Sequence, residues 1–163
     1  MQVMIFLGSE SDIDVIKDAL DILKEFRVPF ELEVTSAHRS PARTVRLVEE
    51  AERQGAEVFI AVAGKAAHLA GVVAAHTVRP VIGVPVESGG LGGLDALLST
   101  VQMPKGVPVA AMGMGKHGGA NAALLAVQIL SLKCPELAAE LKIHRERMAA
   151  QVEAASKKLK QHP

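Results

Sequence analysis

The hydrophobic pattern of the chain predicts five short β-strands. Three of the apolar runs are continuous, as in parallel strands buried on both faces, whereas the run at 30–34 alternates. We expect the strands at residues 3–7, 30–34, 58–63, 81–86 and 107–112. Pro108 cannot donate a ladder hydrogen bond, so it favours an edge or first-residue position in the last strand.

Helical spacing of apolar residues between these runs predicts the connecting helices. We expect helices at about 13–26, 41–54, 94–101, 120–132 and 136–161, and a short helix of small residues that opens with residues 64–71 and ends near Thr77. Ser11 with Asp14 has the spacing of a capping box, and Asp12 is another candidate N-cap. Ser40 before Pro41 is typical of an N-cap followed by a first-turn proline.

Strands that alternate with helices predict an α/β fold with a doubly wound, parallel, five-stranded sheet in three layers. Residues 1–135 are expected to form one α/β catalytic domain. The final helix, within residues 136–163, would be about 38 Å long at 1.5 Å per residue. A domain of this size cannot cover it all, so we expect it to pack on a neighbouring subunit. The alternative is a helix folded back on its own sheet.

Composition excludes several classes of function. The 18 basic and 18 acidic residues balance, which leaves no global electrostatic attraction to nucleic acid or to a membrane surface. Aromatic residues make up 2% of the chain, so stacking platforms for bases or sugars are nearly absent. No apolar run reaches membrane-spanning length. The protein should therefore bind neither nucleic acid nor membrane.

The single cysteine and the N-terminal pattern favour the cytoplasm. Cys134 alone cannot form an internal disulfide or a CxxC metal site. Met1 and Gln2 lead straight into a strand, without a visible signal peptide. A reducing cytoplasmic location is the expectation.

The stretch 35–41 carries the strongest candidate chemistry. His38 and Arg39 lie between an expected strand and an expected helix, at the sheet edge where α/β proteins bind ligands. Histidine can both give and take a proton near neutral pH, and arginine suits bidentate contact with phosphate or carboxylate. The alternative is a surface loop with helix-capping residues.

Two further turns lie at the same expected edge. Residues 8–12 join the first strand to the first helix, where free N–H groups and the hydroxyls of Ser9 and Ser11 could bind an anion. Asp12 could accept hydrogen bonds from ribose hydroxyls. Residues 64–68 follow the third strand, where Lys65 could hold an anion and His68 could line a pocket. An ordinary capped turn and a packing histidine are the alternatives.

Residues 113–118 match the pattern GxGxxG but in the wrong place for a dinucleotide site. That fingerprint belongs in the first strand-to-helix turn, with an acidic residue ending the next strand. Here the pattern follows the last strand, and we expect a glycine-rich loop over 113–119 that closes over an anion. A dehydrogenase is therefore disfavoured.

The sequence shows no pattern typical of a metal site or of a serine hydrolase. The six histidines, His162 among them, show no ligand spacing with carboxylates or thiols, and there is no Gly-x-Ser-x-Gly elbow. We expect no metal.

Several collinear blocks resemble the N5-carboxyaminoimidazole ribonucleotide mutase family, also called the phosphoribosylaminoimidazole carboxylase catalytic subunit. The resemblance covers nearly the whole chain. The blocks lie at residues 8–12, 36–41, 66–69, 81–86, 93–99, 101–104 and 121–126.

The resemblance implies a flavodoxin-like fold, a cytoplasmic homo-octamer and a role in purine (IMP) biosynthesis. It implies an isomerase that shifts a carboxyl group from N5 to C4 of an imidazole ribonucleotide through transient CO2, without metal, biotin or ATP. By motif, His38 corresponds to the proton-transfer histidine. The expected substrate-binding residues are Gly8, Ser9, Ser11, Asp12, Ser36, Arg39, Gly64, Lys65, Ala66, Ala67, His68 and Leu69.

The residues suit this chemistry. A protonated His38 can neutralise N5 as the carbamate breaks, and the neutral base can then remove the C4 proton. The turn at Ser9 and the guanidinium of Arg39 would anchor the phosphate and fix its orientation. A small apolar wall at 66–69 suits uncharged CO2.

Two positions depart from the mutase pattern. Lys65 is a cation at the variable position of the mutase segment Ala-Gly-x-Ala-Ala-His-Leu-Pro-Gly, similar to the arginine of the carboxylase branch, which uses CO2 directly, and Ala70 replaces the proline. Residues 66–69 and 102–104 favour the mutase (class I) branch. The direct (class II) carboxylase and a non-catalytic, oligomeric nucleotide-binding module are the alternatives.

Overall fold

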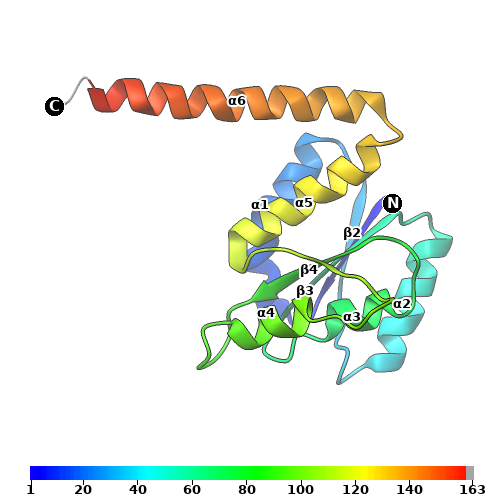
Figure 1. Ribbon diagram of the computed structural model, residues 1–163. Helices are drawn as coiled ribbons and strands as arrows, with labels where there is room; N and C mark the ends of the chain where they lie inside the picture. Colours follow the sequence, from blue (N-terminus) through cyan, green and yellow to red (C-terminus); the bar gives the residue numbers. More distant parts are fainter. Residues whose placement is uncertain (161–163) are drawn as a thin grey trace. The chain divides into compact units, whose positions relative to one another are not determined.

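A five-stranded parallel sheet forms the centre of the computed structural model, which describes residues 1–160 (Figure 1). The strands are β1 (Val3–Leu7), β2 (Phe30–Val34), β3 (Val58–Gly64), β4 (Val81–Val86) and β5 (Ala110–Ala111). They lie in the order β2-β1-β3-β4-β5, and all neighbours are parallel. The expected α/β, doubly wound, flavodoxin-like sheet is confirmed.

Helical segments join the strands or follow the last of them along the chain. They are η1 (Glu10–Asp12, a 3₁₀ turn), α1 (Ile13–Glu25), α2 (Pro41–Arg53), α3 (Leu69–Ala74), α4 (Leu94–Val101), α5 (Gly115–Ser131) and α6 (Pro135–Lys160). None of the described helices is long and apolar enough to cross a membrane.

Side-chain alternation along the strands builds the two faces. Met4 and Phe6 of β1 share one buried cluster with Val48 of α2 and Val73 of α3. Figure 1 shows α1 and the first turns of α5 on the opposite side of the sheet from α2, α3 and α4. Because the central strands are buried on both faces, their turns at the carboxyl edge are held on a rigid base.

The structure corrects three expected boundaries. The fifth strand is only Ala110–Ala111, because Pro108 lacks a ladder donor and pairing with β4 begins after it. The helix after β3 spans Leu69–Ala74 and is shorter than the helix expected to open with residues 64–71 and to end near Thr77. The expected loop 113–119 is wrong from Gly115 onward, where α5 already begins.

Close packing of backbone atoms explains two of the glycines in α5. A Cβ on Gly118 would overlap the carbonyl oxygen of Gly113, and one on Gly119 would overlap the carbonyl oxygen of Val15 in α1. These glycines therefore permit close backbone approach. Of the three glycines in the GxGxxG pattern at 113–118, this packing accounts for Gly118.

The chain divides into two compact units, Met1–Val127 and Gln128–Pro163. The division falls inside α5. In the second unit α6 has 26 residues, close to the expected length. The long C-terminal helix is confirmed, whereas its packing on a neighbouring subunit stays a prediction. His162 lies outside the described residues.

Candidate active site at the carboxyl edge of the sheet

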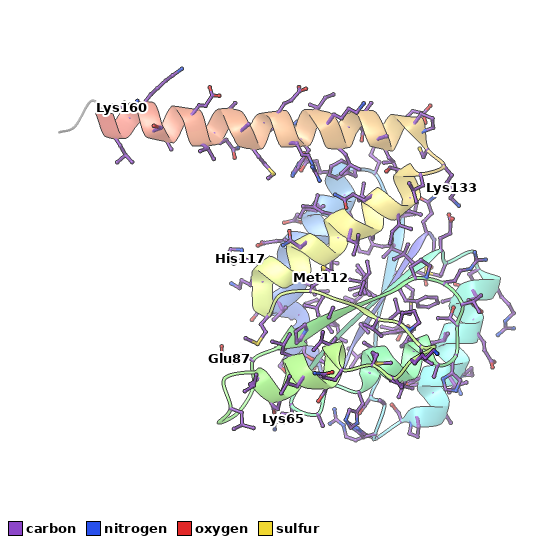
Figure 2. All side chains as sticks on the ribbon, in the orientation of Figure 1. Lys65, Glu87, Met112, His117, Lys133 and Lys160 are labelled. Atoms are coloured by element: carbon purple, nitrogen blue, oxygen red, sulfur yellow. The ribbon has the colours of Figure 1, made fainter. Side chains whose placement is uncertain are left out.

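A cavity of about 550 Å³ opens at the carboxyl ends of β1, β2, β3 and β4. Its wall consists of Gly8, Ser9, Ser11, Asp12, Ser36, Ala37, His38, Arg39, Ala63, Gly64, Lys65, Ala66, His68, Leu69 and Ser88. Neighbouring parallel strands bring these turns together, since all four strands end at the same edge. Figure 2 shows Lys65 and Glu87 at the end of the sheet to which the arrows of β3 and β4 point.

The cavity includes every expected site residue except one. Ala67 is 2% exposed and is not part of the wall. Ala37, Ala63 and Ser88 line the cavity without having been expected there. The sequence feature that could have predicted Ser88 as a lining residue is its position just after β4, at the same edge as the other turns.

The first turn has a different capping arrangement from the expected one. Ser9, and not Ser11, forms the capping box: its Oγ accepts from Ser11 N, and its own N–H donates to Asp12 Oδ2 at 3.1 Å. Asp12 then occupies the N-cap position of α1 without a side-chain cap bond. The turn is therefore fixed by its own side chains before any ligand arrives.

Asp12 is a buried carboxylate at the base of this turn. Burial raises its pKa above the usual 3.8, and the hydrogen bonds from Ser9 and Ser11 oppose that rise. This carboxylate places an acceptor at the cavity wall that can bind hydroxyl donors of a ligand.

The turn after β2 presents Arg39 to the cavity. Its Nη2 donates to the carbonyl oxygen of Gly8 at 3.1 Å, and its backbone N–H donates to Ser36 Oγ at 3.2 Å. Its Nε is 3.4 Å from the same hydroxyl. Because these bonds use only some of the guanidinium donors, the others remain for an anionic ligand beside the β1 turn.

His38 and His68 are joined across the cavity wall. His38 Nε2 lies 2.8 Å from His68 Nδ1, and the two rings meet edge to face with centroids 4.8 Å apart. One of the two nitrogens must carry the hydrogen and the other must accept it. The pair therefore holds a transferable proton at an exposed position of the wall.

Lys65 adopts a backbone conformation that is unusual for its residue type. Its φ is +55°, in the left-handed region that costs about 1 kcal/mol or more for a residue with a Cβ. The residue is exposed and lines the cavity. It thus adds a cationic side chain to the wall beside the small residues of the β3 turn.

Gly64 allows the turns after β3 and β4 to meet. A Cβ at Gly64 would overlap Ser88 Oγ and would lie 3.0 Å from the carbonyl oxygen of Val86. Glycine is therefore needed for the approach of Ser88 to the β3 turn. This contact explains how a residue after β4 comes to line the cavity.

Residues 1–160 contain no group of three or more His, Cys, Asp or Glu side chains arranged to hold a metal ion. The cavity wall itself carries a histidine pair, two cationic side chains, hydroxyls and a buried carboxylate. Together they suit a phosphorylated ligand on which a proton is moved.

Comparison of the whole chain with known proteins identifies a matching family. The family model described as AIR carboxylase matches residues 2–151. The chain is 54% identical over 147 residues to the N5-carboxyaminoimidazole ribonucleotide mutase of Pyrococcus abyssi, covering 90% of this chain and 83% of that protein. It is also 54% identical over 142 residues to the protein of the same name from Bacillus subtilis, covering 87% and 88% of the two chains.

A solved structure has the same fold. The crystal structure of Treponema denticola PurE superposes with a TM-score of 0.88, at 30% identity, and covers 98% of both chains. These matches confirm the resemblance indicated by the sequence motifs. The chain belongs to the AIR carboxylase family.

Proposed function

We propose that this protein is an N5-carboxyaminoimidazole ribonucleotide mutase of purine biosynthesis. It would move the carboxyl group from N5 to C4 of the imidazole, giving 4-carboxy-5-aminoimidazole ribonucleotide. The observation that carries this proposal is the hydrogen-bonded pair His38–His68 beside Arg39 in a preformed cavity. The mutase names of relatives about 50% identical to this chain support the same activity.

The proposed reaction uses one proton twice. His38, as the imidazolium, donates a proton to N5 while the N5–carboxyl bond breaks and CO2 is released. C4 then attacks the CO2 carbon, and the neutral His38 removes the proton from C4. The proton count is restored, so the reaction needs no outside acid, base, oxidant or cofactor.

The remaining wall residues orient the substrate in this proposal. Arg39 and the Ser9 turn bind the phosphate, and Asp12 accepts from ribose hydroxyls. His68 holds the ring of His38 in place through the 2.8 Å bond. Gly64, Ala66 and Leu69 form the small wall beside transient CO2, and Lys65 binds a carboxylate.

Assembly into a homo-oligomer, with an octamer as the expected size, is part of the proposal. Apolar side chains along one face of α4 are exposed, by 55% at Leu94, 46% at Leu98 and 49% at Val101. On α6, Val152 is 71% exposed and Leu159 is 76% exposed. Such stripes favour burial against other copies, and a monomeric mass by light scattering would contradict this part.

A cytoplasmic location completes the proposal. The lone Cys134 is unpaired with any other cysteine, which suits a reducing compartment. Cell fractionation tests this expectation, and enrichment outside the cytoplasm would contradict it.

Substrate supply tests the activity. The purified protein is given N5-carboxyaminoimidazole ribonucleotide, and in a second reaction aminoimidazole ribonucleotide with bicarbonate. Carboxyaminoimidazole ribonucleotide is followed by its ultraviolet absorbance in both. Turnover of the first substrate supports the mutase. Turnover with the second pair alone would assign the direct carboxylase, and binding without turnover would assign a nucleotide-binding module.

A further inference from the structure

Hydrogen bonds of three hydroxyl side chains, those of Thr35, Ser40 and Thr44, stabilise the turn that carries His38. Thr35 Oγ1 and Thr44 Oγ1 lie 2.8 Å apart, and the two residues are 2% and 0% exposed. A hydroxyl pair this deeply buried is costly unless its hydrogen bonds are all made. We call these three residues the hydroxyl clasp.

One consistent set of donors satisfies the whole clasp. Thr44 Oγ1 donates to the carbonyl oxygen of Ser40 at 3.3 Å, which leaves it able to accept from Thr35. Ser40 Oγ donates to the carbonyl oxygen of Ser36 at 3.2 Å and accepts from the N–H of Ser36 at 3.1 Å. Each hydroxyl thus donates once, and those of Ser40 and Thr44 also accept.

The role of Ser40 differs from that expected of an N-cap. It occupies the N-cap position of α2, but its side chain makes no cap bond into the helix and instead points back to Ser36. The N–H of Ser40 also donates to the carbonyl oxygen of Ser36, at 3.0 Å. Residues 36–40 are thereby closed into one turn, with His38 at its exposed tip.

The clasp also ties the turn to the sheet. The N–H of Thr35 donates to the carbonyl oxygen of Leu7 at 2.9 Å, which continues the pairing of β2 with β1. Thr44 lies in the first turns of α2. The Thr35–Thr44 bond therefore joins the end of a strand to the start of a helix directly beneath His38.

From this arrangement we propose that Thr44, through Thr35 and Ser40, is a positioning residue for His38. The proposal rests on the mutase function, because it assigns the clasp a part in that reaction. Loss of the Thr44 hydroxyl removes the 2.8 Å bond of the buried Thr35 hydroxyl and leaves it only the longer, 3.4 Å contact with Ser40 Oγ, so the turn shifts and His38 loses its position. Misplacement by about 1 Å can cost about a hundredfold in rate.

Arg39 should be affected less than His38. Its backbone and Nε are held by Ser36 Oγ and its Nη2 by the Gly8 carbonyl oxygen, and none of these bonds involves the clasp hydroxyls. Phosphate binding should therefore survive the loss of Thr44 Oγ1. The expected kinetic result is a fall in kcat with little change in KM.

The test compares Thr44→Val, which keeps the shape and loses the hydroxyl, with Thr44→Ser, which keeps the hydroxyl. Thr44→Val should lower kcat at least about tenfold with KM within about threefold, and Thr44→Ser should stay within about threefold of wild type. A greater loss of kcat in Thr44→Ser than in Thr44→Val would overturn the proposal, because side-chain shape and not the hydroxyl would then decide the rate. An unchanged kcat in both variants would also overturn it.

Thr100 offers a matched control. It is 2% exposed, and its Oγ1 donates at 2.8 Å to the carbonyl oxygen four residues earlier, as Thr44 does, but it lies in α4 away from the His38 turn. Thr100→Val should lower stability by a similar amount and leave kcat within about twofold. An equal loss of kcat in Thr100→Val would show a general effect of stability and would overturn the proposal.

A second measurement separates this proposal from the function on which it rests. Amide hydrogen exchange at Ser36 and Ser40 should accelerate in Thr44→Val and not in Thr44→Ser, whatever the reaction is. Ser40→Ala provides the same test if Thr44→Val does not fold. Unchanged amide exchange in the variant would show that the clasp hydroxyls do not hold the turn and would overturn the proposal. Absence of turnover in the wild-type protein would overturn the mutase function, and with it the part of the clasp in that reaction. The exchange measurement would still decide whether the clasp hydroxyls hold the turn.

Discussion

His38 Nε2 lies 2.8 Å from His68 Nδ1, although thirty residues separate the two in the chain. The first follows β2 and the second lies just before α3, on turns at opposite sides of the β1 turn in the sheet order. Their contact spans the cavity wall and joins two turns into one proton-bearing unit. The predictions below test this unit and its surroundings.

His38→Asn should abolish the proposed proton transfer while leaving the cavity intact. A positioned acid or base contributes about a hundredfold to ten-thousandfold in rate, so turnover should fall by at least about a hundredfold. Binding of the ribonucleotide, measured by calorimetry, should persist because Arg39 and Asp12 are unchanged. Unchanged turnover would remove His38 from the mechanism.

Two substitutions at His68 distinguish a hydrogen-bonding role from wall packing. His68→Asn places an amide near the position of Nδ1 and can keep the bond to His38, whereas His68→Leu keeps an apolar wall and loses the bond. We expect His68→Asn to retain more turnover than His68→Leu, and only His68→Leu to change the shape of the pH–rate profile. Equal profiles in both variants would argue that the pair has no part in catalysis.

Lys65→Gly tests two effects of Lys65: that of its backbone strain on stability and that of its charge on ligand binding. Glycine adopts a φ near +55° at little cost, so the free energy of unfolding should rise by about 1 kcal/mol in urea denaturation. Loss of the ammonium group should weaken binding of the carboxylated ribonucleotide at the same time. Lys65→Ala is the control, because it loses the charge and keeps the strain. A Lys65→Gly protein with unchanged affinity would assign Lys65 to the solvent-exposed surface alone.

Asp12→Asn should change how stability depends on pH. Because burial raises the folded-state pKa of Asp12 above 3.8, the native state binds more protons there than the unfolded state. The stabilising contribution of Asp12 is then present below pH 3.8 and is lost as the pH rises through its folded-state pKa. Asparagine does not titrate and can still accept from Ser9 N.

Urea denaturation of both proteins between pH 3.5 and 7 checks this sign. The stability of Asp12→Asn relative to wild type should increase with pH over that window. A difference that stays flat or decreases would contradict the direction of the shift. Ribonucleotide affinity should fall in the variant at neutral pH if the carboxylate binds ribose hydroxyls.

Gly118→Ala should destabilise the protein without any change at the cavity. The new methyl group would overlap the Gly113 carbonyl oxygen, and such overpacking costs about 2 kcal/mol. Gly113→Ala is the matched control in the same segment, since a Cβ there meets no atom within 4 Å. Thermal unfolding compares the two, and equal melting temperatures would contradict the packing explanation of Gly118.

Much of the cavity could be predicted because its residues lie in short local patterns. His38 and Arg39, the Ser9 turn and the Lys65 turn each follow an apolar run that ends in polar or glycine residues, and parallel strands bring such turns to one edge. Ser88 was missed because its approach depends on the missing side chain of Gly64, which is a contact between two strands. Ala67 was placed in the wall because sequence adjacency does not give side-chain direction.

The sequence by itself determined the order and type of nearly all strands and helices, since burial on a strand or a helix face repeats with a short local period. Tertiary structure decided the strand order, and with it the 2.8 Å contact of His38 with His68 and the length of β5. It also decided that Ser40 bonds backward to Ser36 and that Gly118 serves packing in α5. These features depend on which backbones approach one another, and residue spacing along the chain does not encode that distance.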